Sequence, residues 1–73
     1  MAVAVYGRKF TDNFAPYIQK FFDKLDSIGV GVLIYEPFLD YLKLRINISD
    51  KVKPFIKNSE IINSAEFLFS VGG

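Results

Sequence analysis

Three segments of the chain are apolar at consecutive positions instead of alternate ones. They are Ala2 to Tyr6, Val30 to Tyr35 and Phe67 to Val71, and the last is followed by Gly72 and Gly73. Short apolar runs rich in branched or aromatic residues and bounded by glycine are typical of strands covered on both faces, as in parallel sheets. The pattern therefore predicts three buried parallel strands, with Ala2 to Tyr6 in the centre.

Between the first two runs, apolar residues recur at helical spacing. Steps of three and one residue keep them on a single stripe: Phe14, Tyr17, Ile18, Phe21, Phe22, Leu25 and Ile28. Thr11 to Asn13 supply candidate N-caps, Pro16 falls in the first turn if Asn13 is the cap, and Gly29 suits a left-handed C-terminal residue. We predict a helix from Phe14 to Ile28 with this stripe on the sheet.

The two faces of this helix have different predicted roles. Phe21 is expected deep against the sheet and Phe22 nearer its margin, so Phe21→Ala should cost about 3 to 5 kcal/mol. Asp23 and Asp26 fall on the opposite face, which we interpret as solvated surface and not as a metal site.

The second half of the chain has a weaker pattern. A second helix is predicted from Glu36 to Ile46, with proline in its first turn. Asn47 to Lys57 is predicted as a loop, with a short strand or turn at Val52 to Ile56. One helical turn, capped by Ser59, is expected over Ser59 to Ser64 before the closing strand.

Strands separated by helices of this length favour right-handed crossover connections. We therefore predict an α/β fold, a three-layer Rossmann-like unit with a short parallel sheet (β-α-β-α-β), in the order second strand, first strand, closing strand. Residues 1–73 would form a single partial domain. The closing strand would have a free edge, so we expect a homo-oligomer that associates through this edge or the second helix.

Composition narrows the function. The chain is 51% hydrophobic with eight Phe and four Tyr, a high aromatic content for a domain that buries only about 60% of its unfolded surface. The net charge of +1, without charged blocks, argues against nucleic acid and a membrane surface as partners. The absence of Cys and His excludes thiolate or imidazole metal sites and Ser-His catalysis within these residues, and we expect a cytoplasmic protein.

The turns after two predicted strands are the candidate sites. Gly7, Arg8 and Lys9 follow the central strand and precede a helix N-terminus, where an anion is favoured. One interpretation is that Arg8 or Lys9 contacts phosphate. The other is a plain solvated turn, which such a segment more often is, because the glycine spacing here is not the GxGxxG of a dinucleotide-binding fold. Asp12 and Asp40 are interpreted as a cap and a surface residue.

The closing strand and its glycines add a family resemblance. Leu68-Phe69-Ser70-Val71-Gly72-Gly73 resembles the strand and first two glycines of the GGDGT motif of NAD kinases, in the wider family of the diacylglycerol kinases and, more distantly, the phosphofructokinases. Val3 to Arg8 is similar to the first strand and Gly/Arg turn of bacterial NAD kinases. Tyr35 to Leu42 resembles the second strand and helix of Bacteroidetes-type members. The resemblance covers the whole chain, but only the N-terminal part of the family's α/β domain.

The resemblance implies transfer of a phosphoryl group from ATP or polyphosphate to the 2′-hydroxyl of the adenosine ribose of NAD, giving NADP, with Mg²⁺ or another divalent cation. Gly72 and Gly73, with Gly7 and Arg8, would bind phosphate or nucleotide. The family's motif Asp would follow Gly73, and the C-terminal β-rich NAD-binding domain is missing. We therefore expect no catalytic residue, metal site or activity in these 73 residues alone.

Other functions fit the same pattern of elements. A flavodoxin-like or receiver-like binding module, or another kinase of the wider family, would share the α/β scaffold. A receiver should have an acidic cluster after the first strand, where this chain has Gly7 and Arg8. A non-catalytic interaction domain would use the surplus aromatic side chains to dimerise.

Overall fold

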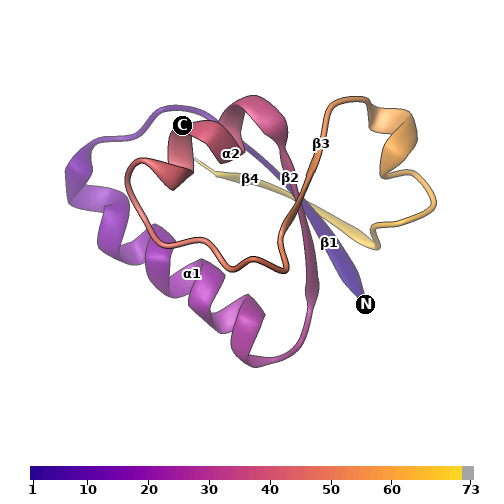
Figure 1. Cartoon of the computed structure of the whole chain (residues 1–73), viewed down its shortest axis with the longest axis horizontal. Helices are drawn as coiled ribbons and strands as arrows, with labels where there is room; N and C mark the ends of the chain where they lie inside the picture. Colours follow the sequence, from indigo (N-terminus) through magenta and orange to yellow (C-terminus); the bar gives the residue numbers. More distant parts are fainter. Residues whose placement is uncertain (72–73) are drawn as a thin grey trace.

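The protein is an open parallel sheet with helices on one side (Figure 1). The computed structural model describes residues 1–71. In chain order the elements are β1 (Ala2–Gly7), the 3₁₀ turn η1 (Asp12–Phe14), α1 (Ala15–Ser27), β2 (Gly31–Tyr35), α2 (Glu36–Lys43), β3 (Lys53–Phe55), the 3₁₀ turn η2 (Asn58–Glu60) and β4 (Phe67–Val71). All strand pairs are parallel and the sheet order is β3-β2-β1-β4.

The order of the strands decides which face each connection covers. From β1 through β2 to β3 the chain advances in one direction, and right-handed crossovers place α1 and α2 on the same face. The chain then returns past β2 and β1 to add β4, and η2 lies on the opposite face (Figure 1). The predicted fold class and the order of the three expected strands are confirmed. The third layer is thin, because it contains a 3₁₀ turn and irregular chain instead of a helix.

The main core lies between the sheet and the two helices. Val3 and Val5 of β1 face the helices, while Ala4 between them faces η2, and all three are buried. The other buried members of the main core are Phe22, Leu25, Val32, Ile34, Phe38, Leu39, Leu42 and Ile46. Burial of consecutive residues confirms that β1 is a central strand.

A smaller core occupies the η2 face. Ile61, which follows η2, packs with Ala4 and Phe55, and Tyr6 joins them at the margin. The Tyr6 ring meets Phe55 edge-on with 5.1 Å between centroids, and its hydroxyl donates a hydrogen bond to the side chain of Asn58. These contacts hold the short third layer on the sheet.

The turn at η2 is stabilised by a carboxylate and not by Ser59, the predicted cap. Glu60 accepts hydrogen bonds from the backbone N–H groups of Ile56 and Lys57, at 2.6 and 2.7 Å. These bonds, that from Lys57 first, lower the pKa of the Glu60 carboxyl because they stabilise its charged form. The turn is a single 3₁₀ turn that starts one residue before Ser59.

The prediction that the closing strand is buried on both faces was wrong. Phe67, Leu68 and Phe69 expose 55%, 61% and 39% of their surfaces. Within residues 1–71, β4 pairs only with β1 and forms the edge of the sheet, so it lies at the margin of the layers that cover β1. The expected free edge is therefore confirmed.

The N-terminal cap of the first helix also differs from the prediction. Residues 12–14 form η1, α1 begins at Ala15 with Phe14 as its cap residue, and no side chain caps either element. Pro16 lies in the first turn and Gly29 has a φ of +75°, both as predicted.

The apolar stripe of α1 divides into two rows. Ile18, Phe22 and Leu25 pack into the core. The second row is spaced by three, four and seven residues and consists of Phe14, Tyr17, Phe21 and Ile28. Its members are exposed except Phe21, which is half-buried against Phe69 with 5.7 Å between ring centroids. The predicted roles of Phe21 and Phe22 are therefore reversed.

The second helix is shorter than predicted. It ends at Lys43, after which the carbonyl of Leu42 accepts hydrogen bonds from the N–H groups of both Arg45 and Ile46. Ile46 is still buried, because this tight turn directs it back into the core. Within residues 1–71 no helix combines the length and the apolar character that crossing a membrane requires.

The two rows of α1 lead to a stability prediction. Phe22→Ala should lower the free energy of unfolding by about 3 to 5 kcal/mol, and Phe21→Ala by about half as much, since Phe22 is buried and Phe21 only half-buried. Urea denaturation followed by circular dichroism measures both. An equal or greater loss for Phe21→Ala would contradict the division into rows.

Candidate functional site

The carboxyl ends of β1 and β4 lie side by side at the point where the chain reverses its direction across the sheet. Gly7 pairs with Val71, and the N–H of Arg8 donates to the Val71 carbonyl at 3.0 Å. Open α/β sheets bind their ligands at such a switch point. The structure thus brings Gly7 and Arg8 to the start of the segment that contains Gly72 and Gly73, which themselves lie outside the described residues.

Gly7 is needed for packing. A Cβ atom at this position would lie 2.2 Å from Cζ and 2.3 Å from Cε2 of Phe38, a buried residue of α2. The Phe38 ring therefore occupies the space that any side chain at position 7 would take. The sequence indicated a permissive turn at Gly7 but gave no sign of this partner.

Phe10 is the next residue of this segment that α2 contacts. Its N–H donates to the hydroxyl of Tyr41, and the same hydroxyl donates to the Phe10 carbonyl, both at 2.9 Å. The two rings meet edge-on with 5.3 Å between centroids. Arg8 and Lys9, both exposed, therefore lie between two residues that α2 holds.

The helix N-terminus expected beside Arg8 is elsewhere. Residues 8–14 separate β1 from α1, and Figure 1 shows this connection running along the upper side of the molecule before the helix starts. The macrodipole of α1 therefore does not act on the turn at Arg8. Any anion there would depend on Arg8, Lys9 and backbone N–H groups.

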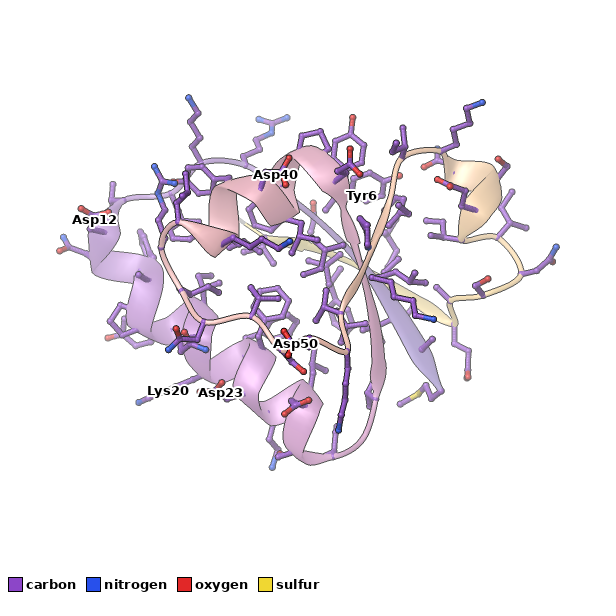
Figure 2. All side chains as sticks on the ribbon, viewed as in Figure 1. Tyr6, Asp12, Lys20, Asp23, Asp40 and Asp50 are labelled. Atoms are coloured by element: carbon purple, nitrogen blue, oxygen red, sulfur yellow. The ribbon has the colours of Figure 1, made fainter. Side chains whose placement is uncertain are left out.

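Carboxylates do not converge on this edge of the sheet. Figure 2 shows Asp12, Asp23, Asp40 and Asp50 spread over the outer surface. Asp12 lies in η1 and caps nothing, contrary to its predicted role. Within residues 1–71 the N-terminal amine and Glu66 form the only ion pair, at 3.9 Å, and no cluster of side chains could hold a metal ion.

A hollow of about 360 Å³ lies at the opposite end of the sheet, beside the start of β2. Its rim includes Asp23 and Asp26 of α1, which are exposed as expected, and Lys51. Gln19 joins the two sides of the rim: its side chain donates to the Asn47 carbonyl at 2.9 Å and accepts from the Asn47 N–H at 2.7 Å. The amino ends of parallel strands are not where α/β sheets place their ligands, so the switch point remains the candidate site.

Comparison with known proteins agrees with the sequence and the fold. The chain is 34% identical over all 73 residues to a protein named NAD kinase from Flavobacterium johnsoniae, and 33% identical to one from Christiangramia forsetii. The chain is thus similar to these two NAD kinases over its whole length. It spans about a quarter of the length of these relatives (25% of each). No family model matches the chain, and no solved structure matches it with significance.

The resemblance to NAD kinases that the sequence predicted is therefore confirmed. The match covers the segments that form β1 and β4, and with them the candidate site. Sequence reasoning placed Gly7 and Arg8 but missed Phe38 and Tyr41. The only signal for these two aromatic residues was their presence on one predicted helix.

The Gly7 contact can be tested with a matched glycine. Gly7→Ala should lower the free energy of unfolding by about 1 to 3 kcal/mol, because the Phe38 ring must move. Gly31→Ala is the control: the nearest atom to its Cβ would lie at 3.6 Å, an ordinary contact, and stability should change by less than about 0.5 kcal/mol. Thermal and urea unfolding measure both; equal effects would contradict the assignment.

Proposed function

We propose that the chain is the N-terminal part of the α/β domain of an NAD kinase and that its β1–β4 edge binds phosphate groups. The observation that supports this most is the match to NAD kinases over all 73 residues, which includes both strands of the switch point. The C-terminal β-rich domain would belong to the rest of such an enzyme.

In such an enzyme ATP or polyphosphate would phosphorylate the 2′-hydroxyl of the adenosine ribose of NAD. Phosphoryl transfer depends on positioned charge, and Arg8 and Lys9 would supply positive charge beside the phosphates. Gly72 and Gly73 would allow their backbone N–H groups to approach closely. The catalytic Asp is expected after Gly73, so we propose that the 73 residues alone are inactive.

The divalent cation that such a reaction uses does not fit a site on residues 1–71, where no group of carboxylates could hold it. We therefore assign no step to a metal held by this part of the chain. The same absence of an acidic cluster at the end of β1 disfavours a receiver-like module. A cytoplasmic location remains part of the proposal.

Phosphate binding is tested with inorganic tripolyphosphate and the ¹⁵N-labelled 73-residue chain. Amide shifts should concentrate at Gly7, Arg8 and Val71, and Arg8→Gln should raise the dissociation constant about tenfold through loss of a charge-assisted contact. Lys20→Gln, an exposed cation of α1 (Figure 2), is the charge-matched control and should change it little. Shifts elsewhere, or equal effects of both variants, would refute the site.

The β4 edge supports a second role, self-association. Within the described residues its backbone groups have no partner strand on one side, and its three consecutive large apolar residues carry no charge that would prevent edge pairing. We propose that two copies pair through β4. This role does not depend on phosphate binding.

Sedimentation over a range of concentrations tests the pairing. Leu68→Lys should shift the chain toward the monomer, because a charged side chain in an edge strand opposes pairing. Leu44→Lys, at a residue that is 84% exposed but outside β4, should leave the association unchanged. A wild-type chain that stays monomeric at high concentration would contradict the proposal.

A further inference from the structure

Helix α2 contacts both ends of the turn that follows β1. Phe38 packs against Gly7, and Tyr41, one helical turn later, bonds to Phe10. Between these two contacts lie Arg8 and Lys9. The helix therefore determines the path of the segment that carries both cations.

The Tyr41 hydroxyl fixes both backbone groups of one residue. It accepts from the Phe10 N–H and donates to the Phe10 carbonyl, each at 2.9 Å, in a part-buried position. Phe10 is outside the β1 ladder, so neither bond belongs to the sheet. The Tyr41 hydroxyl therefore satisfies the backbone N–H and carbonyl of Phe10, as a neighbouring strand would within a sheet.

The Tyr41 side chain is itself held by two neighbouring side chains, those of Arg45 and Phe38. The guanidinium carbon of Arg45 lies 3.6 Å from the centre of the ring, and Arg45 Nη1 donates to the Tyr41 carbonyl at 3.0 Å. The Phe38 ring is nearly parallel to that of Tyr41, at 15° and 6.2 Å. The phenol is therefore preoriented toward Phe10.

We propose that Tyr41 is a positioning residue for the phosphate site: it holds the Arg8-Lys9 segment in the conformation that binds phosphate. This inference rests on the proposed function. When only a fraction of the molecules has the conformation that binds the ligand, the apparent affinity falls by that fraction. A residue that stabilises this conformation therefore raises the affinity without contacting the ligand. Tyr41 would act through Phe10.

The first measurement needs no ligand. Tyr41→Phe keeps the ring and removes both hydrogen bonds, so amide hydrogen exchange at Phe10 should become at least about tenfold faster, with core amides such as Ile34 unchanged. Tyr17→Phe, at a tyrosine 68% exposed on α1, is the matched control and should leave exchange at Phe10 unchanged. Unchanged exchange in Tyr41→Phe would overturn the clamp.

The second measurement is tripolyphosphate binding at a temperature where both variants are fully folded. Tyr41→Phe should raise the dissociation constant about fivefold, and Tyr17→Phe should not change it. If the wild type binds and Tyr41→Phe binds equally well, the positioning role is overturned while the phosphate site stands. If the wild type itself does not bind at Gly7 and Arg8, the proposed function fails first, and the positioning role with it.

A milder variant decides the case if Tyr41→Phe does not fold. Arg45→Gln replaces an exposed side chain and removes the cation from the Tyr41 ring while it keeps the hydroxyl. It should change exchange at Phe10 and the dissociation constant in the same directions, by about twofold. No change in either quantity would overturn the inference.

Discussion

The structure depends on the burial of β1 on both faces and on its pairing at both edges. Val3 and Val5 face the helices and Ala4 the opposite side, and all three are excluded from solvent. The two neighbours of β1 come from distant parts of the chain, β2 immediately after α1 and β4 at the end. Both outer layers of the fold therefore pack against this strand. The candidate site begins where the strand ends.

The site combines a sheet feature with a helix feature. The sheet determines where the candidate site lies, because β1 and β4 end side by side at the point where the strand order reverses. Helix α2 determines the conformation of the turn after β1, because Phe38 requires glycine at position 7 and Tyr41 forms hydrogen bonds with Phe10. The topology of the sheet therefore accounts for the location of the candidate site, and the packing of α2 accounts for its local geometry.

The predictions from sequence succeeded where one periodicity determines the structure. Unbroken apolar runs identified β1 and β2, and helical spacing with Pro16 and Gly29 located α1 within a residue or two. They failed where the outcome depends on neighbours. The run at β4 looks like a buried strand, but its exposure follows from its place at the edge. Helical spacing could not show which row of α1, that of Phe21 or that of Phe22, would meet the sheet.

The return of β4 to the side of β1 has a consequence for the order of folding. β1 is synthesised first, yet one of its edges stays unpaired until residues 67–71 exist, whereas β2 can pair with it as soon as α1 and β2 are complete. Contacts between such distant residues form slowly because a long loop must close before they contribute. A chain that grows from its N-terminus would therefore carry an open, apolar β1 edge until residues 67–71 are synthesised, and capture of that edge by β4 would be the step that protects it from other chains.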